Sequence, residues 1–451
     1  MSYEEELKKN DLGYVWHPFT QMRIQQKWGS KIIVEGKGCK ITDIQGNEYI
    51  DGMGGLFTAA VGHGRQEIIQ ALVEQGEKIA FMSLFDFMTN EPAINLAMKL
   101  AQITPGDLRY VQFGCSGSDA VEIALKIARQ YQARKGFSGR YKIIARRYSF
   151  HGVSFGALSA NGVPAFREAF EPLVPGFRHI QEANCYQCPF GKKYPQCDID
   201  CAQALEQQVL FEDPETVAAF IVDPIPVATG IFDPPTEYLS QVREICNKYG
   251  MLLIFDEIST GFGKTGKLFA SDLYEVEPDI MTMGKALSGG YFPISAVIVK
   301  PEIYEAFLGP TNKEAFLHGQ TFQGHPLGCA VALKNIEIIE RENLIEKAEQ
   351  TGKYLGEKLK ELLKYGIVAD ICGRGLFRGV RLVDENRGDN LCCDIGLEIQ
   401  QRSLELGFYC GFRGSSLIMV LPLIISKEEV DKIVAILDQT IMEAEDKYFK
   451  R

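Results

Sequence analysis

Residues 251–270, MLLIFDEISTGFGKTGKLFA, carry the strongest indication of the fold. The apolar run at 251–255 is typical of a strand that is buried on both faces, as in a parallel sheet. Asp256 and Glu257 follow that run directly. Because ligands bind outside the carboxyl ends of the strands in open α/β sheets, this order predicts a binding site at the end of the strand.

The neighbouring segments alternate between helical and strand-like patterns. Residues 118–135, SDAVEIALKIARQYQARK, have helical apolar spacing, and residues 141–147, YKIIARR, are strand-like. A short apolar run at 218–222 and an amphipathic stretch at 238–250 repeat this order. The alternation predicts a mostly parallel sheet that is covered by helices.

The two ends of the chain have a different pattern. Residues 31–52, KIIVEGKGCKITDIQGNEYIDG, contain short strand-like pieces broken by glycines, and the chain after about residue 325 has a long helical pattern followed by further strands. We therefore expect residues 1–60 to be the N-terminal part of a small domain, 61–324 a large domain, and 325–451 the C-terminal part of the small α+β domain.

The composition is that of a globular protein. Among 451 residues, 48 Lys and Arg stand against 59 Asp and Glu, which gives a formal charge of −11 and disfavours nucleic acid or an anionic membrane as a partner. No apolar run reaches the roughly 18 residues of a membrane helix, and the first residues lack a signal-peptide core. Most of the 12 cysteines are scattered among apolar residues, as reduced thiols are. We expect a cytoplasmic protein.

Four cysteines, Cys185, Cys188, Cys197 and Cys201, lie in one short stretch with the spacing C-x2-C-x8-C-x3-C. This spacing is compatible with a structural zinc site, with reduced structural thiols and with a redox pair. The sequence leaves these three interpretations open.

Two further segments contain candidate chemical groups. Gly117 and Ser118 stand at a predicted helix start, where free N–H groups bind phosphate, although a simple capped helix has the same pattern. Lys285 ends a short apolar run between small neighbours. A buried lysine with a lowered pKa forms Schiff bases, and a buried aspartate such as Asp256 keeps a pyridine nitrogen protonated. In isolation, a solvated lysine and a capping aspartate are the alternatives.

Taken together, five motifs resemble those of one enzyme family. They are SGSDAVE (116–122), YSFHG (148–152), FDEISTGFGKTG (255–266), MGKALSGG (283–290) and HGQTFQGHPLGCAVAL (318–333). In this order the chain resembles the class III aminotransferases of the fold-type I pyridoxal-phosphate group, from about Trp16 to about Ile425. The resemblance implies an α/β fold with a mostly parallel seven-stranded sheet in a large domain, a smaller α+β domain from both termini, and pyridoxal 5′-phosphate as cofactor.

The resemblance also implies roles for individual residues. Lys285 would form the Schiff base with the cofactor and move the substrate proton, and Asp256 would pair with the pyridinium nitrogen. Gly117 and Ser118 would bind the phosphate. No step of this chemistry requires a metal.

Further roles concern the cofactor ring and the assembly. Phe150 and Ile258 would pack on opposite faces of the ring, and His151 would either orient the stacking loop or simply fill space. Thr321 would reach the phosphate of a neighbouring subunit, which implies a homodimer, or a tetramer made of two such dimers, with active sites at the interface.

Departures from the family pattern concern the substrate. Ser259 stands where ornithine- and 4-aminobutyrate-type members usually carry Gln, and Asp223 replaces a usual Glu. Phe57 should line the substrate entrance. Arg413 lies two residues from the expected position of the carboxylate-binding arginine, so binding an acid group and having no such role remain equal alternatives.

The resemblance implies an aminotransferase that moves an amino group from a primary ω-amine to a 2-oxo acid, pyruvate or 2-oxoglutarate. Taurine, β-alanine, 4-aminobutyrate and diamines are the candidate donors. A diaminopelargonate-type aminotransferase, an aminomutase or ammonia-lyase on the same fold, and a non-catalytic or metal-organised interaction protein are the alternatives.

Overall fold

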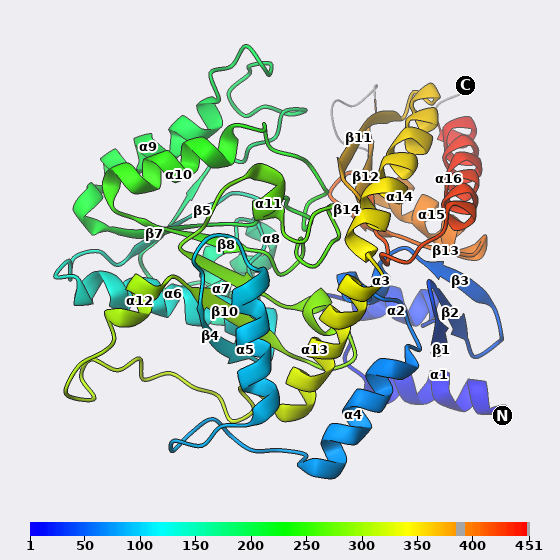
Figure 1. The fold of residues 1–451 in the computed structure, drawn as a ribbon. Helices are drawn as coiled ribbons and strands as arrows, with labels where there is room; N and C mark the ends of the chain where they lie inside the picture. The colour runs from blue at the N-terminus through cyan, green and yellow to red at the C-terminus, as the bar shows by residue number, and fades with distance from the viewer. Residues whose placement is uncertain (385–392, 449–451) are drawn as a thin grey trace.

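A computed structural model describes residues 1–384 and 393–448 of the chain. Figure 1 shows two lobes, a larger one built around a central sheet and a smaller one that carries both termini. Helix α13 (Pro326–Arg341) runs between them. No helix in the described ranges is both long enough and apolar enough to cross a membrane.

The large lobe is built on a sheet of seven strands in the order β4-β10-β9-β8-β7-β5-β6. Strand β10 is antiparallel to both of its neighbours, whereas the pairs β5–β6, β5–β7, β7–β8 and β8–β9 are parallel. This confirms the expected mostly parallel sheet of seven strands. The strands are β4 (Tyr110–Gly114), β5 (Lys142–Arg146), β6 (Phe177–Ile180), β7 (Val217–Val222), β8 (Leu252–Asp256), β9 (Ile280–Met283) and β10 (Ser295–Val299).

Helices cover both faces of this sheet. Neighbouring residues of β7, such as Phe220 and Ile221, belong to different core clusters, because alternate side chains of a strand point to opposite faces. The cluster of Phe220 includes residues of α9 (Asp200–Glu212) and α10 (Tyr238–Tyr249), and the cluster of Ile221 includes residues of α6 (Gly117–Arg134). The continuous apolar runs in the sequence are explained by this burial on two sides.

The helices of this part of the chain are α4 (Gln66–Lys78), α5 (Glu91–Ile103), α6 (Gly117–Arg134), α7 (Phe155–Ala160), α8 (Pro164–Arg167), α9 (Asp200–Glu212), α10 (Tyr238–Tyr249), α11 (Ala270–Tyr274) and α12 (Pro301–Glu305). Short 3₁₀ turns span Glu168–Phe170, Pro214–Thr216, Lys285–Ser288 and Lys360–Lys364.

The small lobe combines segments from both ends of the chain. One four-stranded sheet has the order β1-β2-β3-β13, in which β13 pairs in parallel with β3. A second has the order β11-β12-β15-β14 and is antiparallel. The strands are β1 (Ile33–Lys37), β2 (Lys40–Asp43), β3 (Glu48–Asp51), β11 (Val368–Arg374), β12 (Phe377–Leu382), β13 (Phe408–Tyr409), β14 (Gly411–Arg413) and β15 (Ser416–Val420).

The helices of the small lobe are α1 (Tyr3–Tyr14), α2 (Met22–Trp28), α14 (Leu344–Leu359), α15 (Cys393–Glu405) and α16 (Lys427–Tyr448). The segment labelled α3 (Gly54–Phe57) is a turn in which Gly55 and Leu56 have left-handed dihedral angles. The domain limits at residues 60 and 324 stay predictions, and residues 385–392 and 449–451 of the predicted C-terminal part lie outside the described residues.

Candidate active site

The strands β8 and β9 end side by side at one edge of the large sheet. Asp256 is the last residue of β8, and it pairs in register with Thr282 of β9. Lys285 follows β9 by two residues. Because the two strands are parallel, their carboxyl ends place Asp256 and Lys285 at the same edge, as the sequence predicts.

The amine of Lys285 faces a polar and an aromatic side chain. Its Nζ donates a hydrogen bond to Oγ of Ser259 at 2.6 Å and lies 4.7 Å from the centroid of the Phe57 ring. Removal from water lowers the pKa of Lys285 to about 8, although the negative charges of Asp256 and Asp223 act in the opposite direction. A substantial fraction of the amine is therefore neutral near physiological pH, as nucleophilic attack requires.

The carboxylate of Asp256 is buried and held on both oxygens. Oδ2 lies 2.8 Å from Nδ1 of His151, and Oδ1 accepts hydrogen bonds from the backbone N–H of Ile258 at 3.1 Å and from Oγ1 of Thr282 at 3.3 Å. The His151 side chain is fully buried, and its Nε2 has no hydrogen-bond partner among the described residues. His151 thus contacts the Asp256 carboxylate directly, and its role towards the stacking loop stays a prediction.

The start of helix α6 lies beside this pair. Ser116 caps the helix by accepting a hydrogen bond from Asp119 N, which leaves the N–H groups of Gly117 and Ser118 without a partner inside the helix. The Ser118 hydroxyl accepts a hydrogen bond from the backbone N–H of Val153 at 3.0 Å. The segment after β5 is thereby joined to the helix start.

Glycines allow the close approach of these segments. A Cβ atom on Gly152, whose φ is +131°, would lie 2.6 Å from Oγ of Ser118. A Cβ atom on Gly117 would lie 3.1 Å from Cδ1 of Ile258. Ile258 is therefore placed against the helix start, and Phe150 stands two residues before Gly152 on the facing segment.

Two of the predicted site residues lie outside this cluster. Thr321 is exposed, in the segment between α12 and α13. The guanidinium of Arg413, at the end of β14, is exposed and donates a hydrogen bond to the carbonyl oxygen of Phe412 at 2.9 Å. The roles of both residues stay predictions.

Comparison with known proteins identifies the family. The family model for class III aminotransferases matches residues 24–441. The chain is a class III aminotransferase. It is similar to the adenosylmethionine-8-amino-7-oxononanoate aminotransferase of Staphylococcus aureus, with 38% identity over 85% of this chain and 86% of that protein. It is also similar to the putrescine–pyruvate aminotransferase of Pseudomonas aeruginosa, with 34% identity over 94% of each chain.

A solved structure of the same kind bears on the cofactor. The omega transaminase from Pseudomonas jessenii in complex with PMP superposes with a TM-score of 0.94, at 33% identity, over 98% of each chain. Class III aminotransferases use pyridoxal 5′-phosphate, so the predicted enzyme class, fold type and cofactor are confirmed. The residues present fit this group, since they provide a primary amine at Lys285, a buried carboxylate at Asp256 and free N–H groups at the start of α6 for a phosphate.

The cysteine cluster lies elsewhere. Cys185, Cys188, Cys197 and Cys201 line one small cavity and are free thiols. Burial raises the pKa of Cys185 to about 11 and that of Cys201 to about 12, and neighbouring thiols add to both shifts. Within residues 1–384 and 393–448, no group of three or more His, Cys, Asp and Glu side chains is arranged to hold a metal ion.

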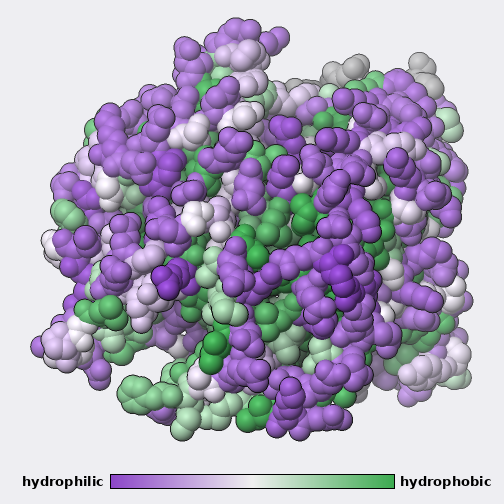
Figure 2. Space-filling model, viewed as in Figure 1, coloured by the Kyte–Doolittle hydropathy of each residue, from purple (hydrophilic) through white to green (hydrophobic). Residues whose placement is uncertain are grey.

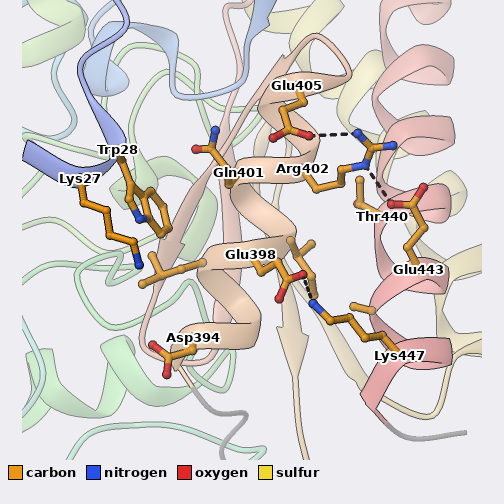
Figure 3. A pocket seen from close by; sticks show the side chains of 13 residues that line it. Lys27, Trp28, Asp394, Glu398, Gln401, Arg402, Glu405, Thr440, Glu443 and Lys447 are labelled. Carbon is orange, nitrogen blue, oxygen red and sulfur yellow. Dashed lines mark hydrogen bonds and ion pairs between the residues drawn. The ribbon is translucent and has the colours of Figure 1, made fainter. Parts of the chain in front are cut away.

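A groove of about 660 Å³ lies in the small lobe between α2, α15 and α16 (Figure 3). Arg402 at its wall pairs with Glu443 and Glu405, both at 2.9 Å, and Lys447 pairs with Glu398. The pairs of Arg402 with Glu443 and of Lys447 with Glu398 thus join α15 to α16.

The sequence does not predict two features of the structure, one inside the site and one outside it. Ser259 was noted only as a departure from the family pattern, yet its hydroxyl contacts Lys285. Lys264 was not singled out, although it is fully buried. The burial of Lys264 could have been predicted from its neighbours, because it stands in a run of glycines and apolar residues, GFGKTGKLF at 261–269.

Proposed function

We propose that this aminotransferase moves an amino group from a primary ω-amine to a 2-oxo acid, either pyruvate or 2-oxoglutarate. The observation that carries the proposal is the amine of Lys285, which has a lowered pKa and lies beside Asp256 at the sheet edge with the Phe57 ring against it. When bound there, pyridoxal 5′-phosphate supplies a carbonyl group that accepts and returns an amino group and a ring that withdraws electrons.

Each residue of the candidate site would have a separate role. Lys285 would hold the cofactor and would move a proton between the substrate carbon and the cofactor. Asp256, which lies 2.8 Å from Nδ1 of His151, would keep the ring nitrogen protonated. Gly117 and Ser118 would bind the phosphate, and Phe150 and Ile258 would enclose the ring.

The donor would contact Phe57 and Arg413. The Phe57 ring next to Lys285 would pack against the carbon chain of an amine whose reacting end is at Nζ. If the Arg413 guanidinium turns towards that chain, it binds a carboxylate or sulfonate at the far end. Taurine, β-alanine and 4-aminobutyrate carry such a group, whereas putrescine does not.

A second candidate is a diaminopelargonate-type reaction. It is favoured by the similarity to the S. aureus relative, which is named as an adenosylmethionine-8-amino-7-oxononanoate aminotransferase. That reaction uses a different, larger pair of substrates, so the two candidates are distinguished by the amine that is consumed.

A homodimer is part of the proposal. The segments before α5 and before α13 lie together, with Phe81 and Phe322 ring centroids 5.4 Å apart, and they expose apolar side chains around Thr321. The exposed residues of this apolar patch are Phe81, Phe85, Phe87, Met88, Leu317 and Phe322. Figure 2 shows apolar atoms at the lower edge of the molecule, where the chain between α4 and α5 lies. A second copy of the chain would bury this patch and bring Thr321 to the partner's site.

A half-reaction screen tests the function. The enzyme with bound pyridoxal 5′-phosphate is mixed with taurine, β-alanine, 4-aminobutyrate, putrescine or adenosylmethionine, and conversion to the pyridoxamine form is followed by absorbance. Rapid conversion by one ω-amine, reversed by pyruvate or 2-oxoglutarate, supports the proposal. Conversion by adenosylmethionine alone favours the second candidate, and turnover of an amine without any oxo acid indicates a lyase or mutase.

A further inference from the structure

Lys264 is a fully buried charged residue outside the set proposed to hold the cofactor. It lies in the glycine-rich loop after β8, and its side chain has no exposed surface. Its Nζ donates hydrogen bonds to the carbonyl oxygens of Leu421 at 3.1 Å and Ala59 at 3.4 Å. Because a buried ammonium is costly unless it is hydrogen-bonded, these two carbonyls are anchored to it.

The backbone around Lys264 joins the two lobes. Its carbonyl oxygen accepts from Leu376 N at 2.9 Å, and Leu421 N donates to the carbonyl oxygen of Leu376 at 3.1 Å. Leu423 N in turn donates to the carbonyl oxygen of Ala60 at 2.8 Å. Lys264 therefore stands where the large-lobe loop, the chain after β15 and the chain after α3 meet.

The turn that precedes Ala59 has an unusual backbone. The φ angles of Gly54, Gly55, Leu56 and Phe57 are 51°, 56°, 65° and 73°. Left-handed angles are unfavourable for residues with a side chain, because Cβ comes too close to the backbone carbonyl oxygen. The conformation of Leu56 and Phe57 must therefore be held by contacts with the rest of the structure.

Charged groups hold the turn from two sides. The buried Asp51 carboxylate accepts hydrogen bonds from Gly55 N at 2.7 Å and Met53 N at 3.2 Å, and it lies 2.8 Å from Nε2 of His63. Lys264 holds the other end at Ala59. Burial lowers the pKa of Lys264 to about 7, and the negative charge of Asp51 opposes that shift.

The turn ends at the aromatic ring next to the reactive amine. Phe57 is buried, and its ring centroid lies 4.7 Å from Nζ of Lys285. A movement of the turn would move this ring, which forms one side of the space beside the amine. The position of the ring thus depends on how the turn is held.

We propose that Lys264 is a positioning residue for the amine substrate: it ties the left-handed turn at 54–57 to the large-lobe loop and to the chain after β15, and so sets the place of Phe57 beside Lys285. This inference rests on the proposed function, in which Lys285 and Phe57 form the amine site. Lys264 itself does not contact the reacting atoms. Its effect is transmitted through the backbone at Ala59 and Leu421.

The test compares two single variants. Lys264→Met keeps the length of the side chain but removes its charge and its hydrogen-bond donors, whereas Lys264→Arg retains both. We expect Lys264→Met to raise the KM for the amine about 10-fold or more while kcat changes much less, since a contact made in both the ground state and the transition state is lost. Lys264→Arg should recover most of the wild-type KM. Lys267→Met, in the same loop but at an exposed lysine, is the matched control and should behave as the wild type.

A second measurement does not depend on turnover. Hydrogen–deuterium exchange of the apoenzyme should be faster in the peptide spanning residues 52–61 of Lys264→Met and normal at the start of α6. If Lys264→Met does not fold, Lys264→Gln, which keeps a neutral donor, takes its place. Wild-type KM and wild-type exchange in the folded variant would overturn the inference. Full activity of a Lys285→Ala variant would instead overturn the proposed function, without changing the exchange result.

Discussion

Lys285 and Lys264 are both removed from water, but their surroundings suit different tasks. Lys264 donates to two backbone carbonyls that hold its amine in place, and burial lowers its pKa to about 7. Lys285 has one hydroxyl partner, Ser259, and an aromatic ring beside it. Burial lowers the pKa of Lys285 to about 8, so the amine can lose its proton and react.

The role of Lys285 is tested by Lys285→Ala. We expect the variant to lose at least about 100-fold in transamination rate, because both the covalent hold on the cofactor and the proton transfer are removed. Steady-state assays measure the loss of transamination rate. The visible absorbance of the bound cofactor measures the loss of its covalent link to the lysine. Lys267→Ala serves as a lysine control, and equal activity of both variants would contradict the assignment.

The pKa of Lys285 predicts a pH dependence for cofactor uptake. Only the neutral amine attacks the cofactor carbonyl, and with a pKa of about 8 this form grows as the pH rises. The rate at which apoenzyme takes up pyridoxal 5′-phosphate should rise about 10-fold per pH unit below pH 8 and level off above it. Stopped-flow absorbance measures this rate. If the rate instead continues to rise towards pH 10, the pKa of Lys285 is not lowered and the prediction is wrong.

Among the elements, helix α6 supplies the anion site through its first turn. The helix runs from Gly117 to Arg134, and aligned peptide dipoles place a partial positive charge at its start. The Ser116 side chain accepts a hydrogen bond from the N–H of Asp119. The N–H groups of Gly117 and Ser118, which are nearest the candidate site, have no partner inside the helix. The segment containing Gly152 packs on this turn, so the two elements shape the phosphate seat together.

Gly152→Ala tests this packing. The new Cβ would lie 2.6 Å from Oγ of Ser118, at a φ angle that favours glycine, so one of the two segments must shift. We expect the affinity of apoenzyme for pyridoxal 5′-phosphate to fall about 10-fold or more, as measured by titration. Gly13→Ala, which meets no atom within 4 Å, should keep the wild-type affinity. Unchanged binding by Gly152→Ala would argue against a phosphate seat here.

At the scale of the whole molecule, an exposed apolar patch lies around Thr321. Phe87 and Leu317 have exposed fractions of 108% and 80%. Large apolar side chains gathered in two adjacent segments indicate an interface. The predicted role of Thr321 needs that interface, because the residue lies on the patch and not beside Lys285.

The variant Phe87→Asp/Leu317→Asp tests the assembly. Two charges that would be buried between subunits should convert the homodimer to a monomer and reduce activity with it, because Thr321 no longer reaches a partner. Sedimentation velocity measures the mass. Phe211→Asp, at an exposed phenylalanine of α9, should leave the dimer intact. A wild-type protein that is monomeric at micromolar concentration would contradict the proposal.

The sequence by itself determined the sheet and the identity of the chemical groups at its edge. An apolar run followed by Asp256, and a second followed by Lys285, place these residues at strand ends through local geometry alone. The glycine and serine at the start of α6 follow from helix-start preferences in the same way. These features depend on residues a few positions apart, which is why periodicity and motif order predict them.

Only the tertiary structure decided which side chains meet. Lys285 contacts Ser259, 26 positions away, Asp256 contacts His151 across 105 positions, and Lys264 reaches Ala59 across 205. No local pattern encodes such distances, because they result from the packing of separate elements against one another. The left-handed turn beside Lys285 depends on the same packing, since the surrounding contacts hold a backbone conformation that Leu56 and Phe57 would not adopt alone.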